Sequence, residues 1–363
     1  MNSLQEKKRK NSAVVIISSL LLLLVFSILP LSCRSSEPSE EYKKNSPSAK
    51  RISVFISDIS PDGKTLLFEY GTPYWSRLGT YDLANGKVHK YESDQVNKNM
   101  TRPRYSWDGK RIVFLAGKDI TAHQNIYIMD ADGRNLRKIT NSDQMYYGLP
   151  SFSPDGKRII FARWHLKRKR AFPLEGEMKT AWDLYEMDLA TGAERRLTNY
   201  KFYKINFSSY MPDGKNFLFS AEGPVNSTGK GPKNFEEYEK LYGNNFIFIM
   251  DGINNELKPA IINGSNSAIP FAAADNSIIF VSETTSDNSP KKTKELFLYT
   301  KGEITQLTKL GAYIRWGKIS RDGSTIVFAR YEDQKSYIES LWLMKSDGTE
   351  LREIKIPVDD LKE

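Results

Sequence analysis

Few residues of this chain have side chains suited to catalysis or metal binding. Its 363 residues include three histidines, and His89, His123 and His165 lie far apart and follow no metal-ligand spacing. No Gly-x-Ser-x-Gly motif marks a serine nucleophile. The segment from Asp130 to Gly133 resembles the start of a calcium loop but lacks the downstream glutamate, so we interpret it as a hairpin turn. The sequence therefore predicts no catalytic residues, no metal and no cofactor.

The single cysteine, Cys33, lies where an export signal ends. A basic run over residues 7–10 precedes an uncharged apolar stretch over residues 13–29, which is the order of a secretory signal. The Leu-Pro-Leu-Ser sequence before Cys33 resembles the relaxed lipoprotein signals of spirochaetes, although Pro30 stands where leucine is usual. We predict that residues 1–32 are a lipoprotein signal peptide and that Cys33 is lipidated. A plain signal peptide and an uncleaved anchor are the alternatives.

Charge and composition narrow the class of the mature protein. The chain carries a formal charge of +9, and cleavage before Cys33 removes a net +3, so +6 remains. An exported protein with this modest excess is not expected to bind nucleic acid. The mean hydropathy of −0.51 excludes a protein that crosses the membrane many times. Residues 33–51 are rich in serine, proline and charge, and we expect a flexible tether.

The remaining chain repeats one short pattern six times. Each copy has an apolar strand-like run, an acidic turn and a second apolar run that reaches a phenylalanine five or six residues after the acid. Asp-Gly turns supply the backbone conformation that tight hairpins need. The acids, which we predict to be structural turn residues, are Asp62, Asp108, Asp155, Asp213, Asp275 and Asp322.

A second pair of strand-like runs follows each copy, as in residues 125–140 and 183–198. Four antiparallel strands in a unit of roughly 45–60 residues are typical of a propeller blade. We therefore predict an all-β fold, a six-bladed β-propeller of four-stranded antiparallel blades, over residues 52–357. Residues 358–363 are a C-terminal tail. We expect each blade to be complete in itself, unless residues 39–51 add a strand.

Three motifs of the repeat carry a family resemblance. The Ser-x-Asp-Gly-Lys pattern, followed by Ile-Tyr-x-Met-Asp and Arg-x-Leu-Thr, is similar to the repeat of the TolB-like propeller family. The resemblance covers residues 52–357 and implies the fold more than the function. The family's preceding α/β domain would not fit between Cys33 and Ile52. The repeat also resembles the propellers of prolyl-oligopeptidase-type hydrolases, but the given sequence has no hydrolase motif.

One face of the predicted ring carries all the variation in loop length. The longest loops, residues 164–181 and 222–243, join second to third strands, and aromatic residues lie in the connections between blades. Long loops on a rigid scaffold are where binding is usually found. The aromatics could alternatively pack between blades, and the basic run could be a solvated loop. The candidate partner-binding residues are Tyr146, Tyr147, Lys167, Arg168, Lys169, Arg170, Tyr200, Phe202, Tyr203 and Tyr313.

These features together indicate a monomeric, lipid-anchored scaffold of the bacterial envelope, with the outer membrane favoured. The expected partner is an envelope protein, and the resemblance points to a peptidoglycan-associated lipoprotein. One alternative is a lyase or hydrolase that acts on glycans at the channel mouth, for which clustered acids or histidines would be expected. The other alternative is a surface-exposed antigen that contacts a host.

Overall fold

The computed structural model describes the folded part of the chain with short gaps. The described residues are 52–92, 96, 99–117, 124–164, 168–169, 177–178, 182–200, 202–223, 237, 245–254, 256–261, 267–284, 293–333, 338–357 and 361. The predicted signal peptide, Cys33 and the predicted tether lie outside these residues. Within the described residues, no helix is both long and apolar enough to cross a membrane.

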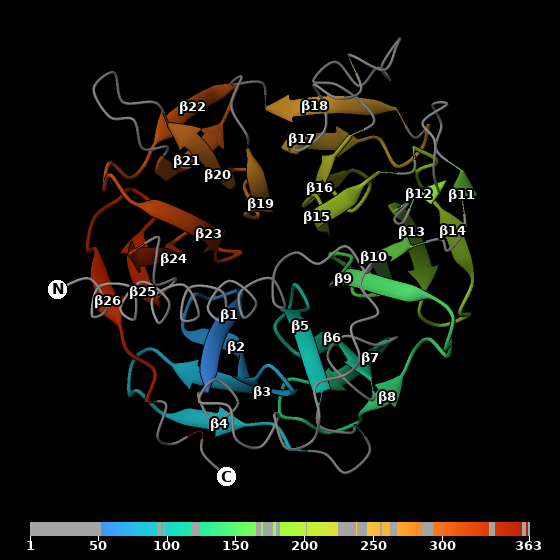
Figure 1. Ribbon diagram of the computed structural model, residues 1–363, viewed down its shortest axis with the longest axis horizontal. Helices are drawn as coiled ribbons and strands as arrows, with labels where there is room; N and C mark the ends of the chain where they lie inside the picture. Colours follow the sequence, from blue (N-terminus) through green and yellow to red (C-terminus); the bar gives the residue numbers. More distant parts are fainter. Residues whose placement is uncertain are drawn as a thin grey trace, which may run out of the picture.

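The strands form six four-stranded antiparallel units around a central axis, as predicted (Figure 1). Blades 1 to 3 comprise β1 (Ser53–Ile59), β2 (Thr65–Thr72), β3 (Trp75–Asp82), β4 (Val88–Lys90); β5 (Asn99–Tyr105), β6 (Arg111–Gly117), β7 (Asn125–Asp130), β8 (Arg137–Lys138); and β9 (Tyr146–Phe152), β10 (Arg158–Trp164), β13 (Trp182–Asp188), β14 (Glu194–Arg196). Blades 4 to 6 comprise β15 (Lys204–Tyr210), β16 (Phe217–Glu222), β17 (Asn245–Met250), β18 (Leu257–Ile261); β19 (Ala268–Ala272), β20 (Ile278–Thr284), β21 (Thr293–Thr300), β22 (Glu303–Gln306); and β23 (Tyr313–Ile319), β24 (Thr325–Asp333), β25 (Ile338–Lys345), β26 (Arg352–Ile354).

The acidic turns join the first and second strands of every blade. In blade 1 the Ser60 hydroxyl donates to Asp62 at 2.7 Å and accepts the backbone N–H of Thr65 at 2.9 Å. The same serine–aspartate turn recurs in blades 2, 3 and 6, where the Ser153 hydroxyl of blade 3 donates to Asp155 at 2.6 Å. Each of the six aspartates also accepts the backbone N–H two residues further on. In all six blades the repeated acid therefore makes a hydrogen bond within its own turn.

The second strand of each blade carries the core that holds neighbouring blades together. The repeated phenylalanines are all fully buried: Phe68, Phe114, Phe161, Phe219, Phe280 and Phe328. Phe280 follows its aspartate by one residue fewer because Asn276, with φ 68°, closes a tighter turn there. Each of these rings lies in an apolar cluster that joins adjacent blades, so its burial stabilises the contact between them.

The ring closes by packing between blades 1 and 6. Ile56 and Phe68 of blade 1 share an apolar cluster with Val327 and Ile354 of blade 6. Among the described residues, β1 pairs with β2 and β26 pairs with β25, so the four strands of each terminal blade are consecutive in sequence. Residues 39–51 lie outside the described part of the chain. This arrangement agrees with the expectation that each blade is complete in itself.

Candidate functional site: the loop face and the central channel

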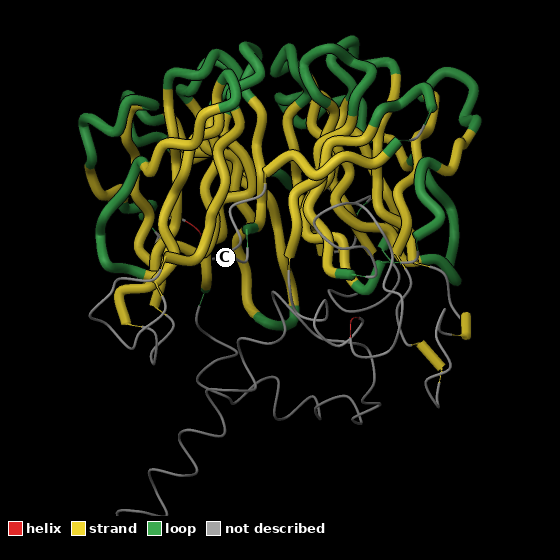
Figure 2. The backbone as a smooth tube through the Cα atoms, turned by 90° about the horizontal axis from the view of Figure 1, so that it is seen from above, coloured by secondary structure: helices red, strands yellow, loops and turns green. Residues whose placement is uncertain are grey.

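The two ends of the ring are built differently. The Asp turns and the hairpins between third and fourth strands lie together on one end, the turn face, which is seen along the upper edge of Figure 2. Asp82 and Asp188 shape two of these hairpins by accepting backbone N–H groups, as their repetition in the sequence predicts. The connections between second and third strands and between blades lie on the opposite end, which we call the loop face.

Five tyrosines of the predicted binding face lie at the loop face with part of their surface exposed. The Tyr146 ring lies 4.6 Å from that of Trp164, and the Tyr313 ring lies 5.7 Å from that of Tyr331. Tyr147 packs against Phe161 in the same way, and burial raises the pKa of its hydroxyl. The full set with partial exposure is Tyr146, Tyr147, Tyr200, Tyr203 and Tyr313. Four of these rings, those of Tyr146, Tyr147, Tyr200 and Tyr313, are therefore held by a second aromatic side chain.

Phe202 corrects one part of the predicted surface. Its side chain is fully buried and packs against Phe219 and Phe248 of blade 4, with ring centroids 5.7 and 6.3 Å away. Its backbone pairs with Trp182, which ties the connection to blade 3. Phe202 is thus a wedge between blades 3 and 4, because an apolar ring next to two others is more stable inside than in water.

The basic run of blade 3 is described only in part. Arg168–Lys169 form β11, which pairs antiparallel with β12 (Glu177–Met178). Lys167 and Arg170 lie outside the described residues, as do His123 and His165. The prediction that this run contacts a partner therefore stays a prediction.

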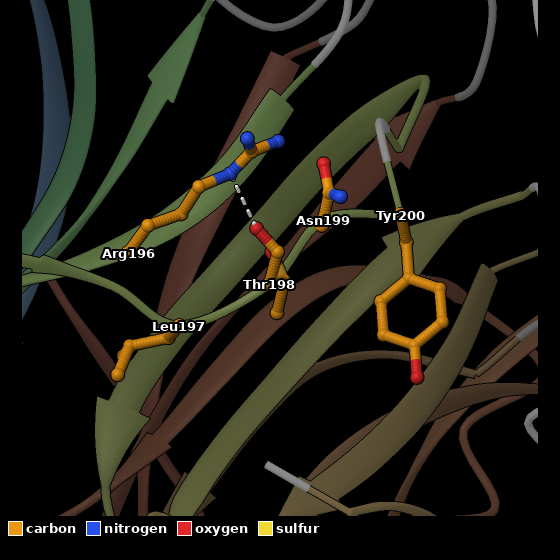
Figure 3. A pocket seen from close by; sticks show the side chains of 5 residues that line it. All are labelled: Arg196, Leu197, Thr198, Asn199 and Tyr200. Atoms are coloured by element: carbon orange, nitrogen blue, oxygen red, sulfur yellow. Dashed lines mark hydrogen bonds between the residues drawn. The ribbon is translucent and has the colours of Figure 1, made fainter.

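A pocket of about 360 Å³ lies at the connection between blades 3 and 4 (Figure 3). It is lined by Arg196, Leu197, Thr198, Asn199 and Tyr200. Buried Asp183 accepts hydrogen bonds from the Arg196 guanidinium at 2.5 Å and from the Thr198 hydroxyl at 2.8 Å.

The same arrangement recurs elsewhere in the ring. In blade 5 the Thr308 hydroxyl donates to Glu295 at 2.5 Å, and in blade 2 Thr140 donates to Asn125 at 3.1 Å. The Arg-x-Leu-Thr motif therefore locks the fourth strand to the third. Since the polar groups of the pocket serve this structural role, they do not by themselves indicate a ligand.

Charged residues on the inner strands were missed by the sequence analysis. Arg104 of β5 and Lys318 of β23 are each 6% exposed, and Asp58 of β1 lies near both of them. All three stand four residues before the repeated aspartate, where the other blades have Ser151, Ser209 and Phe271. Comparison of that one position across the six repeats would have exposed this difference.

The one described histidine is part of a hollow on the turn face. His89 lies on β4, and the centroid of its ring is 5.0 Å from that of Tyr91. The hollow has a volume of about 440 Å³ and lies between blades 1 and 2. In the described part of the chain no group of three or more His, Cys, Asp or Glu residues could hold a metal ion.

Comparisons with known proteins agree with this architecture. No family model matches the chain. The Tol-Pal system protein TolB of Dinoroseobacter shibae is 28% identical over 183 residues, 41% of this chain and 38% of its own length. TolB from Acinetobacter baumannii superposes with a TM-score of 0.54 at 22% identity, over 84% of this chain and 63% of that one. The fold is a TolB-like β-propeller.

Other proteins that share the propeller fold have names that describe them as enzymes. The uncharacterized peptidase YuxL of Bacillus subtilis is 25% identical over 204 residues, which cover 47% of this chain and 30% of YuxL. An oligogalacturonate lyase in complex with manganese gives a TM-score of 0.54 at 14% identity, over 83% of this chain and 77% of that one. This chain thus spans less than two fifths of the curated relatives YuxL and TolB.

Proposed function

We propose that this protein is a non-catalytic, lipid-anchored propeller of the bacterial envelope that binds a partner protein through its loop face. The observation that carries the proposal is the set of five partly exposed tyrosines, several of which rest on a second aromatic ring. Tyr146 on Trp164 and Tyr313 on Tyr331 are the clearest cases.

Rings held in this way suit protein recognition. Tyrosine offers a large contact area with a polar tip, and aromatic anchors supply much of the binding free energy at interfaces. A ring already fixed by its neighbours loses little conformational entropy when a partner covers it. Tyr146 and Tyr313 stand at the starts of inner strands in blades 3 and 6, on opposite sides of the ring (Figure 1). A partner that contacts both would cover the mouth of the channel.

The envelope location rests on the leader and on the relatives. The predicted signal over residues 1–32 and lipidation of Cys33 would place the propeller at a membrane surface. Among the relatives is TolB of the Tol-Pal system, so a peptidoglycan-associated lipoprotein is the partner we propose first. Replacement of Cys33 by alanine should move the protein from the membrane fraction to the soluble fraction. Retention of the variant in the membrane fraction would argue for an uncleaved anchor instead.

The partner interface can be tested by crosslinking in cells followed by mass spectrometry. We expect the double variant Tyr146→Ala/Tyr313→Ala to lose at least about tenfold of the crosslinked partner, since each ring is an anchor worth roughly 1 kcal/mol or more. Tyr81→Ala is the matched control, because Tyr81 is a partly exposed tyrosine near the turn face. Equal recovery of partner by the double variant, with an unchanged circular dichroism spectrum, would refute the loop-face interface.

An enzyme that acts on an anionic glycan is the second candidate. The observation that favours it is the basic charge on the inner strands, which suits an anionic substrate, although it is not the cluster of acids or histidines expected for this alternative. The similarity in fold to an oligogalacturonate lyase is consistent with this reading. The test is to incubate the purified protein with uronic-acid oligosaccharides and to measure the size of the products. Cleavage of the oligosaccharides by the wild type but not by Arg104→Met would favour the enzyme. Oligosaccharides that stay intact would favour the scaffold.

A further inference from the structure

The six inner strands that surround the axis carry a strong excess of positive charge. These strands, β1, β5, β9, β15, β19 and β23, are the closest to the centre in Figure 1. Together they hold one acidic residue, Asp58, and five basic ones. The basic residues are Arg102, Arg104, Lys204, Arg315 and Lys318. Charges on edge strands around an axis face one another, so such an excess is costly unless an anion offsets it.

Arg104 reaches across the axis. It belongs to blade 2, yet its guanidinium lies 4.5 Å from the ring of Phe207 in blade 4 and 4.4 Å from the ring of Phe271 in blade 5. Arg104 is 6% exposed, and its Nη1 atom has no hydrogen-bond partner. Ser209 of blade 4, at the equivalent position of the repeat, is fully buried and its hydroxyl is also unpartnered. Two buried donors without acceptors therefore lie at equivalent positions of the inner strands, and that of Arg104 lies between rings of blades 4 and 5.

Two further cations surround this point. The Lys318 ammonium lies 4.2 Å from the Phe271 ring and donates to the Ser57 carbonyl of blade 1. The Arg321 guanidinium stacks 4.0 Å from Trp107 and donates to the Ala272 carbonyl at 2.5 Å. Burial lowers the pKa of Lys318 well below its usual range, and the nearby Arg104 lowers it further.

Two carboxylates act on these three cations, Asp58 on all of them and Glu69 on Lys318. Asp58 is 6% exposed and accepts the backbone N–H of Tyr105 at 2.9 Å. Its charge favours the protonated forms of Arg104, Lys318 and Arg321. Asp58 and Glu69, of which Glu69 also acts on Arg102, do not balance the inner tier, which we define as Arg104, Lys318 and Arg321, so this tier keeps a positive excess.

A second tier of cations lies nearer the loop face. Arg102, Lys204 and Arg315 come from alternate blades 2, 4 and 6, and both arginines lower the pKa of Lys204 together with its burial. More than a third of the Arg102 surface is accessible to water, and burial of the rest of the side chain within the ring lowers its pKa.

Acids accompany this outer tier. They are Glu69 beside Arg102, Glu222 beside Lys204 and Glu339, which pairs with Arg315. The outer tier is thus close to balanced, and the unbalanced charge lies deeper, at the inner tier.

We infer that the central channel binds a small polyanion whose carboxylate or phosphate groups contact the inner tier first and the outer tier second. Arginine and serine donors with no acceptor fit the oxygens of such groups. Where both tiers lie on one strand they are two residues apart, from Arg102 to Arg104, or three, from Arg315 to Lys318, which is about 7 to 10 Å, so an anion with several charged groups can reach both. The depth of Arg104 favours a small solute over a folded partner.

Binding can be measured by calorimetry on the mature protein at constant ionic strength, with citrate, pyrophosphate and inorganic phosphate as separate probes. We expect at least one polyanion to bind, and Arg104→Met to weaken it by about tenfold or more, the effect of losing one charge-assisted hydrogen bond. Lys318→Met should act in the same direction. Arg352→Met is the control, since Arg352 lies exposed on outer strand β26. Preference between citrate and pyrophosphate separates carboxylate from phosphate ligands.

Thermal unfolding tests whether a variant loses binding because it fails to fold. Without ligand, Arg104→Met and Lys318→Met should melt at or above the wild-type temperature, because a buried cation is replaced by an apolar side chain of similar size. With ligand at a concentration near the wild-type Kd, the wild type and Arg352→Met should gain more stability than the two channel variants. Absence of binding by all three probes, or equal binding by wild type and both channel variants, would overturn the proposal.

Discussion

The second and the inner strands of the same blades follow the sixfold repeat to different degrees. In the second strands the repeated phenylalanine is kept in all six blades and is fully buried in each. In the inner strands the residue four positions before the turn aspartate differs from blade to blade, as Asp58, Arg104 and Lys318 show.

The difference has a physical cause. A second strand packs only against its neighbours, so the same solution serves every blade. Equivalent inner-strand residues meet one another around the axis, where six like charges would repel. The repeated positions therefore serve folding, and the positions that break the repeat are free to serve binding. The following expectations test that division, from the largest effect to the smallest.

Removal of a repeated core ring should be the most damaging change. Phe161→Ala should lower the free energy of unfolding by about 3–5 kcal/mol, because it leaves a cavity between blades 2 and 3. Urea denaturation followed by tryptophan fluorescence measures this. The control Ile304→Ala, at a side chain that is 41% exposed, should change stability by less than about 0.5 kcal/mol. Similar losses for both variants would contradict a core formed by the second strands.

Loss of the ion pair between Arg196 and buried Asp183 in blade 3 should have the second-largest effect on stability. Asp183→Asn should cost about 2 kcal/mol, because the buried Arg196 contact loses its charge while the Thr198 hydroxyl keeps an acceptor. Asn125 naturally fills this role in blade 2. A double-mutant cycle with Arg196→Met, read by denaturation, should show strong coupling. Additive effects would mean that the pair contributes no specific interaction.

The serine of an Asp turn should matter less. Ser153→Ala should cost about 1 kcal/mol, since its hydroxyl donates to Asp155 and accepts the N–H of Arg158 at 2.9 Å. Blades 4 and 5 have Met211 and Ala273 at this position and still form the turn. A loss greater than about 3 kcal/mol would show that the turn depends on serine in a way that those two blades contradict.

Low pH should destabilise the Asp turns of several blades at once. The Ser60 hydroxyl holds the pKa of Asp62 below its ordinary 3.8. In Asp108, Asp155 and Asp322 burial raises the pKa of the carboxyl. Hydrogen bonds from serine and backbone N–H outweigh this effect, so the pKa is lowered overall. A carboxyl with a lowered pKa stabilises the fold above its ordinary pKa, so this stability is lost as pH falls below about 4. Denaturation at pH 3 and pH 6 should show the loss, and Asp155→Asn should reduce it.

Replacement of a repeat-breaking cation should have the smallest effect on stability. Lys318→Met should leave the free energy of unfolding unchanged within about 1 kcal/mol or raise it, because methionine packs on Phe271 without a buried charge. Thermal unfolding without added anion measures this. A marked loss of stability would assign Lys318 to the fold and remove the contrast between inner and second strands.

Much of the fold was predictable from local sequence. The Asp turns, the strands beside them and the buried phenylalanines each depend on residues within one hairpin, and six copies of the same pattern specified six blades. The hydrogen bonds of the turn aspartates are local in the same way, since Asp62 and its partner Ser60 are two residues apart. The five loop-face tyrosines were also identified, because their position in the repeat placed them at that face.

The tertiary structure alone decided which of these side chains are accessible and which charges meet. Phe202 looked like its tyrosine neighbours in sequence, but the angle between blades 3 and 4 places it inside. Arg104, Phe271 and Lys318 are far apart in the chain and converge only because six blades close into a ring. Local pattern determines a blade, whereas the chemistry of the axis arises from six blades at once, and no single repeat contains it.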